Sequence, residues 1–121
     1  MPTPSEFVLL EARKLIQTPT AWTTGCIARD AAGRPCSATA PEATRFSLMG
    51  ALHSASRHRL SAFASEAACL LLGDMLAKRL GQKLPAVNGS KLAVDLVAVF
   101  NDIATHDAVL SLIDSALRKR A

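Results

Sequence analysis

The stretch VFNDIATHD, residues 99–107, decides how the C-terminal half of the chain is organised. It places five polar residues directly after the apolar run LAVDLVAV. Asn accepts the left-handed conformation in which many helices end, so Asn101 predicts the end of a helix. Thr105 predicts the N-cap of the next helix, with Asp107 in its first turn, where the helix dipole favours an anion. We therefore interpret the stretch as a polar turn between two helices, in which only Asp102 lacks a local role.

The segments on both sides of this turn carry apolar residues at helical spacing. KLAVDLVAVF, residues 91–100, is rich in Val and would also suit a buried strand. We prefer a helix, because its apolar residues fit one helix face together with the residue that follows: Leu92, Leu96, Val99, Phe100 and Ile103. THDAVLSLIDSALRKR, residues 105–120, predicts the last helix more clearly, because its apolar residues form one stripe.

Three further helices are predicted upstream. Residues 4–17 begin one at Pro4 or Ser5, and residues 60–81 form the longest, with Gly81 as its C-cap. Residues 40–56, APEATRFSLMGALHSAS, predict another, with Pro41 at the first helical position. A Gly in mid-helix costs about 1 kcal/mol relative to Ala. We therefore expect a close helix–helix contact at Gly50.

A β-hairpin is predicted between the first two helices. Its strands cover residues 23–29 and 34–38, and DAAG is a turn signal in which Gly33 takes a positive φ. Two strands alone are marginally stable in water, so the hairpin must pack on the helices. The predicted fold class is α+β, mostly α: about five helices in a compact bundle with one short hairpin, as a single domain over residues 1–121.

Composition excludes several classes of protein. Half of the 121 residues are hydrophobic and a fifth are charged, which allows a real core and argues against disorder. The longest strongly apolar run, AACLLLG, is too short to span a bilayer, and no signal peptide is visible. Three cysteines at irregular spacing do not form a disulfide framework. We expect a cytoplasmic protein with reduced thiols and no membrane partner.

The basic residues form two short clusters, RHR at residues 57–59 and RKR at residues 118–120. The net charge of +4 is mild, and the other basic residues are dispersed. A duplex-binding surface normally shows a denser basic stripe. A weak nucleic-acid binder is therefore one alternative, with these candidate contacts: Arg57, Arg59, Arg118 and Arg120.

One order of residues matches a thiol hydrolase: Cys26, then His53 or His58, then Asn101 or Asp102. Papain-like enzymes place the nucleophile at a helix N-terminus, where the dipole lowers the pKa of the thiol. Cys26 is instead predicted to lie in a strand. We therefore interpret it as a small core thiol.

No metal or cofactor motif is evident. Cys26 and Cys36 flank the hairpin turn at a spacing wider than a zinc knuckle uses. His53 and His58 are five residues apart and do not share a helix face, and no glycine-rich phosphate loop occurs. We expect no catalytic residues, no metal and no cofactor, and leave open whether the two cysteines have a chemical role.

Three segments together resemble a known family: residues 21–35, 42–52 and 100–117. They carry a Trp before an ARD-x-x-G turn, an A-x-x-(aromatic)-x-x-x-GAL helix, and an aromatic–Asn–Asp step before the last helix. The matching residues are Trp22, Ala28, Arg29, Asp30, Gly33, Ala43, Phe46, Gly50, Ala51, Leu52, Asn101 and Asp102. The chain is similar here to small bacterial and phage proteins catalogued only as a domain of unknown function. Members tend to have Trp where this chain has Phe46. The resemblance implies the architecture and no activity.

The resemblance implies that the hairpin and the last interhelical turn meet. We hypothesise that Asp102 pairs with Arg29, or accepts backbone N–H groups of the hairpin. Trp22 is expected to anchor the hairpin on the core, with an exposed contact for a partner as the alternative. The candidates for ligand or partner contacts are Trp22, Arg29, Asp30, Asn101 and Asp102.

These observations favour a non-enzymatic interaction module, an adaptor or inhibitor that acts through contacts with a protein partner. Self-association is left open. The first alternative is a small-ligand-binding or hydrolytic domain centred on Arg29, Asp102 and Trp22, and the second is the weak nucleic-acid binder. A large exposed apolar patch would favour the module. A pocket that joins the hairpin to the Asn101–Asp102 turn would favour the ligand-binding alternative.

Overall fold

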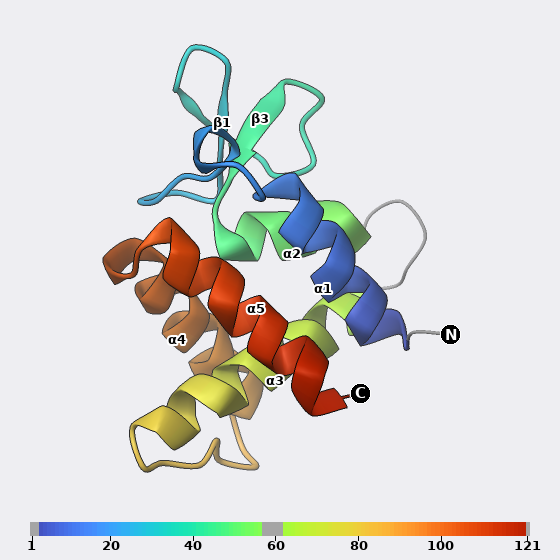
Figure 1. Cartoon of the computed structure of the whole chain (residues 1–121), viewed down its shortest axis with the longest axis vertical. Helices are drawn as coiled ribbons and strands as arrows, with labels where there is room; N and C mark the ends of the chain where they lie inside the picture. The colour runs from blue at the N-terminus through green and yellow to red at the C-terminus, as the bar shows by residue number, and fades with distance from the viewer. Residues whose placement is uncertain (1–2, 57–61, 121) are drawn as a thin grey trace.

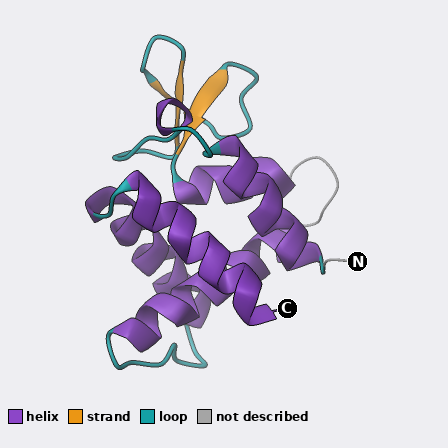
Figure 2. Cartoon of the chain, viewed as in Figure 1, coloured by secondary structure: helices purple, strands orange, loops and turns teal. Residues whose placement is uncertain are grey.

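A small sheet stands at one end of a group of helices in the computed structural model, which describes residues 3–56 and 62–120 (Figure 1). The helices are α1 (Pro4–Leu15), α2 (Leu48–Ser56), α3 (Ala62–Arg79), α4 (Gly89–Ile103) and α5 (His106–Arg120), with a short 3₁₀ turn, η1 (Pro19–Ala21). The strands are β1 (Ala28–Asp30), β2 (Pro35–Cys36) and β3 (Ala43–Phe46). Helices dominate the structure, as Figure 2 shows, which confirms the predicted α+β, mostly α, class.

Several helix ends follow from local sequence signals. Thr3 caps α1 and forms a capping box with Glu6, and Gly81 takes a φ of +72° after α3. The hydroxyl of Thr105 accepts the backbone N–H of Ala108 at 3.1 Å, which confirms its predicted role as the N-cap of α5. The ambiguous segment over residues 91–100 is part of helix α4, as preferred.

The helix predicted over residues 40–56 is wrong in its first half. Residues 43–46 form strand β3, and α2 begins only at Leu48. Ser47 caps α2, because its hydroxyl accepts the backbone N–H of Gly50 at 3.1 Å. β3 pairs antiparallel with β1 and gives the strand order β2-β1-β3. The third strand covers an edge that a two-stranded hairpin would leave open, and long-range pairing therefore overrides the local helix signal of Pro41.

The predicted hairpin lies where expected, between α1 and α2, but its strands are shorter. β1 and β2 pair at only two positions, Ala28 with Cys36 and Arg29 with Pro35. Residues 23–27, which were predicted as strand, form a loop before β1. Gly33 closes the turn with a φ of +84°, as predicted. The loop stays bonded to the sheet, because the backbone N–H of Thr23 donates to the carbonyl of Phe46 at 3.0 Å, and it is also held by α4, as described below.

The core lies where the helices pack against one another below the sheet. Its largest fully buried side chains come from every helix and include Leu9, Leu52, Leu72, Val97 and Leu112. The expected helix–helix contact at Gly50 is wrong: a Cβ there would collide with the backbone carbonyl of Ile27, so the close neighbour is the loop before β1. Among the described helices, none has both the length and the apolar character needed to cross a bilayer.

Candidate functional site

Asn101 joins the sheet to the helices. It is buried in the last turn of α4, two residues before the helix ends at Ile103, so it does not end the helix in a left-handed conformation as predicted. Its Oδ1 accepts the indole N–H of Trp22 at 2.7 Å and the backbone N–H of Leu48 at 3.0 Å, and its Nδ2 donates to the carbonyl of Thr23 at 3.1 Å. The N–H of Leu48 is one of the donors that the start of α2 leaves without an intrahelical acceptor. One amide therefore holds the loop before β1, the start of α2 and α4 together.

Asp102 is exposed and binds the same loop. Its Oδ1 accepts the backbone N–H of Gly25 at 2.9 Å. The hypothesis that Asp102 accepts a backbone N–H group of the predicted hairpin is therefore confirmed. Within the described residues Asp102 makes no ion pair with Arg29, so the other hypothesis is wrong. Gly25 takes a φ of +83°, and a Cβ there would lie 3.7 Å from Nη2 of Arg29. Arg29 and Asp102 thus approach Gly25 without meeting.

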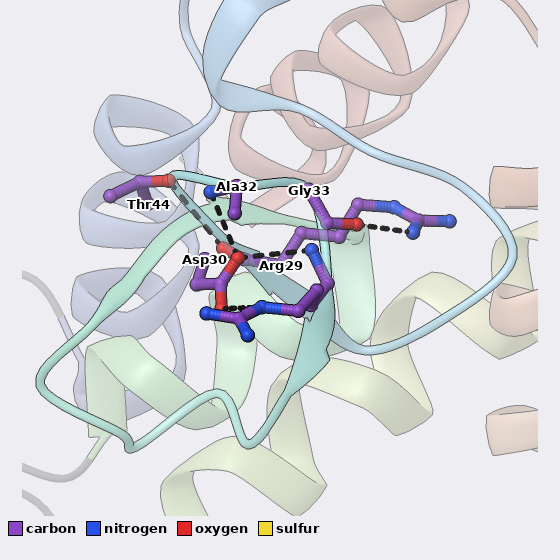
Figure 3. Close-up of polar contacts among 6 residues, drawn as sticks. Arg29, Asp30, Ala32, Gly33 and Thr44 are labelled. Carbon is purple, nitrogen blue, oxygen red and sulfur yellow. Dashed lines mark hydrogen bonds and ion pairs between the residues drawn. The ribbon is translucent and has the colours of Figure 1, made fainter.

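The side chains of Arg29 and Asp30 bind the backbone of the hairpin turn (Figure 3). The guanidinium of Arg29 donates to the carbonyl of Gly33 at 2.9 Å and the hydroxyl of Thr23 at 2.8 Å. Oδ1 of Asp30 accepts the backbone N–H groups of Ala32 and Arg34, each at 2.9 Å. The backbone N–H of Arg34, helped by the charge of its guanidinium, holds the pKa of Asp30 below its usual value. Asp30 thus binds within the turn, and Arg29 links the turn to the loop before β1.

Trp22 is half-buried at the junction. Besides its bond to Asn101, its ring lies 5.5 Å from the ring of His106 at a tilt of 46°. Nε2 of His106 is 2.6 Å from the carbonyl oxygen of Ile16, so it donates in the tautomer that protonates this nitrogen. The structure therefore brings Trp22, Asn101 and Asp102 together, with Arg29 and Asp30 in the adjoining hairpin. Their binding of a ligand or partner stays a prediction.

A hollow of about 290 Å³ joins the loop before β1 to α2 and α4. Cys26, His53 and Asp102 all line it, so the residues in thiol-hydrolase order do meet at one place. The thiol of Cys26 donates to the carbonyl of Ala28 at 3.3 Å, and within the described residues it makes no hydrogen bond with His53. The nucleophile–base contact that such chemistry requires is therefore not formed. His58 lies outside the described residues.

The three cysteines are free. Burial, with the charges of Asp30 and Glu42, raises the pKa of Cys36. Burial also raises the pKa of Cys69 to about 11, with a smaller effect from Glu66. In the described part of the chain, no three or more His, Cys, Asp or Glu side chains are grouped to hold a metal ion. Both thiols are thus protonated at neutral pH.

A second feature lies on the other edge of α4. Three large apolar side chains are exposed there, Leu80 by 67%, Val99 by 57% and Ile103 by 80%. They surround a hollow of about 210 Å³ with Arg79 at its side. We call these residues, with Leu76, Leu96 and Phe100 of the same hollow, the α3–α4 face.

The apolar residues that predicted the helix do not form its most deeply buried face, although Leu96 and Phe100 pack against the core. The residues of α4 that are buried are Gly89, Ala93, Val97 and Asn101, which lie about a quarter turn away from the predicted stripe. Small residues decide this orientation, because a Cβ on Gly73 of α3 would lie 2.5 Å from Cβ of Ala93. Gly73 was the residue from which this contact could have been predicted, because a Gly inside the longest apolar helix marks a place where a partner helix can approach closely.

The nucleic-acid candidates are only partly described. Arg118 is exposed on α5 and donates to the hydroxyl of Ser115 at 3.1 Å. Arg57 and Arg59 lie outside the described residues, and so does the side chain of Arg120. The proposed basic contacts stay a prediction.

One family model, "Family of unknown function (DUF6197)", matches residues 1–119. This match covers nearly the whole chain and confirms the resemblance to a domain of unknown function. No curated protein and no solved structure matches the chain.

Proposed function

The chain belongs to the DUF6197 family, and we propose that it is a non-enzymatic interaction module that acts by protein contacts. The observation that carries this proposal is the α3–α4 face. Its three exposed side chains lie around one hollow, whereas single exposed apolar residues are common on any protein surface. A contiguous apolar surface of this kind marks an interaction site.

The charges beside the α3–α4 face indicate which partner fits it. Arg79 lines the hollow, and Asp95 lies on α4 one helical turn before Val99. Within the described residues neither has an ion-pair partner, whereas the neighbouring Lys78 pairs with Asp74 at 3.1 Å. A two-fold contact presents the same patch from both copies, so each charge can meet its opposite on the other copy. We therefore propose a second copy of this chain as the occupant.

Sedimentation velocity over a wide concentration range tests this proposal. The wild-type chain should form a dimer, and Ile103→Lys or Val99→Lys should raise the dissociation constant at least about tenfold, because each buries a charge in an apolar contact. Val94→Lys is the matched control: Val94 is 41% exposed on the opposite edge of the same helix. A wild-type monomer at every concentration, or equal weakening by the control, would contradict the proposal.

The narrower parts of the proposal rest on the sequence and the resemblance. These are the roles of adaptor or inhibitor, the cytoplasmic location and the bacterial or phage origin. The α3–α4 face supports protein contacts in general, with self-association as the case that the surrounding charges favour.

A further inference from the structure

Two adjoining hollows form one groove along the side of α4 that faces α2. The smaller, described above, continues into a larger one of about 480 Å³ between α2, α3 and α4. They share Met49 and His53 of α2 and Val94 of α4. Small-molecule sites commonly have volumes of about 300–1,000 Å³. The groove is therefore large enough for a small ligand, and it lies on the edge of α4 opposite the α3–α4 face.

The floor of the larger hollow is apolar and adaptable. Met49 and Cys69 lie beneath it, with Sγ of Cys69 3.6 Å from Sδ of Met49, and Leu70 and Val94 complete it. Because the pKa of Cys69 is about 11, its thiol is uncharged at neutral pH. Methionine fills irregular spaces and adjusts to different apolar partners. The floor thus suits an alkyl chain or a ring.

The acidic and basic side chains on the walls differ in whether they have a partner in the described part of the chain. Oε1 of Glu66 accepts the hydroxyl of Ser90 at 2.9 Å, and Asp102 accepts the N–H of Gly25. His53 and Lys91 line the larger hollow from α2 and α4, and neither side chain has a hydrogen-bond or ion-pair partner among the described side chains of residues 3–56 and 64–118. Both acids accept a hydrogen bond within the chain, whereas neither base has an acceptor in the part of the chain that the structure describes. An anionic group is what these walls can still bind.

We propose that this groove binds a small amphipathic carboxylate. Its apolar part lies on Met49, Cys69, Leu70 and Val94, and its carboxylate faces His53 and Lys91. This inference is independent of the proposed self-association, because it uses the other edge of α4.

Decanoate, titrated into the protein by isothermal calorimetry, is the first probe. Binding should be saturable, and 1-decanol, which has the same chain length without the charge, should bind at least about tenfold more weakly. Lys91→Gln and His53→Gln should each weaken decanoate binding several-fold and leave decanol binding unchanged. Both residues are exposed, so neither substitution should affect folding. Lys83→Gln, an exposed lysine outside the groove, is the control.

A blocking substitution tests the location. Val94→Trp fills the shared part of the groove and should abolish decanoate binding. Leu92→Trp places the same side chain at a residue of similar exposure, 39% against 41%, on the other edge of α4, and should leave binding unchanged. Equal affinity for decanoate and decanol, no effect of Lys91→Gln and His53→Gln, or no binding by the wild type would overturn the proposal. Sedimentation velocity of the same variants shows whether they still dimerise. A failure of decanoate binding can therefore be told apart from a failure of self-association.

Discussion

At the scale of single residues, the turn around Asn101 shows which side-chain roles can be predicted from the sequence and which cannot. The roles of Thr105 and Asp107 were predictable, because capping and helix-dipole effects act within one turn. The role of Asn101 was not, because its partners Trp22 and Leu48 are 79 and 53 residues away. An Asn is common both at helix ends and in buried networks, and only the distant partners distinguish the two.

Asn101→Ala should destabilise the protein by about 3 kcal/mol, because it leaves the indole N–H of Trp22 and the backbone N–H of Leu48 without acceptors in a buried place. Urea denaturation followed by circular dichroism measures this change. The adjacent Asp102→Ala is the matched control and should cost no more than about 1 kcal/mol, since Asp102 is exposed and makes one bond to the loop. Equal effects of the two substitutions would mean that Asn101 does not hold the junction.

At the scale of elements, local patterns predicted the helices and the hairpin turn but not the third strand. Residues 40–43 read APEA, which matches the start of a helix, and nothing in ATRF distinguishes a strand from a helical turn. β3 forms because its backbone groups meet those of β1. The orientation of α4 is not evident from the sequence for a similar reason: its apolar residues fit two faces, and the contact of Gly73 with Ala93 selects one.

Gly73→Ala should destabilise the protein by about 2 kcal/mol, because the added methyl group overlaps Ala93 where α3 and α4 are closest. Thermal denaturation gives the change in melting temperature. Ala93→Gly in the same chain moves the missing methyl group to the other helix, so the double variant should recover part of the loss. Additive effects of the two substitutions would show that the helices do not meet through these residues.

A bidentate ion pair links α1 to α5. Nε and Nη2 of Arg13 donate to the two carboxylate oxygens of Asp114 at 2.6 and 3.1 Å. The hydrogen bonds from Arg13 and its charge lower the pKa of Asp114. Because the pKa is lower in the folded state, the pair contributes stability above the unfolded pKa of about 4 and loses it as the pH falls through the folded value.

Asp114→Asn should therefore cost about 0.5–1 kcal/mol at pH 7, a modest value because both side chains are about one third exposed. The stability difference between wild type and variant should shrink progressively below pH 4. Urea denaturation at a series of pH values checks it. A difference that stays constant down to pH 2 would contradict the assignment to Asp114 ionisation.

At the scale of the whole molecule, α4 separates two surfaces with different properties. One edge carries the α3–α4 face, and the other forms the groove with α2. From the sequence, an interaction module was predicted because no catalytic, metal or cofactor motif was evident. Neither surface could be located in the sequence, because each combines residues from segments that only the fold brings together. His53 and Lys91, for example, are 38 residues apart and carry no motif.

The proposed self-association predicts how the dissociation constant of the dimer responds to substitutions that change charges alone. Arg79→Glu and Asp95→Arg should each weaken the dimer, because each places like charges at opposite ends of a two-fold contact. The double variant exchanges the two signs and should restore the dissociation constant to within about threefold of the wild type. Sedimentation velocity at low salt measures all three. No recovery in the double variant would show that these residues do not meet across the contact.

Three of the bonds that hold the N-terminal third of the chain come from its last quarter. Arg13 binds Asp114, the carbonyl of Ile16 binds His106 and Trp22 binds Asn101, over separations of 101, 90 and 79 residues. During synthesis on the ribosome, α1 and the hairpin are made before α4 and α5, which supply these partners. Long loops must close before such contacts form. The junction of sheet and helices therefore cannot form until α4 and α5 have been made.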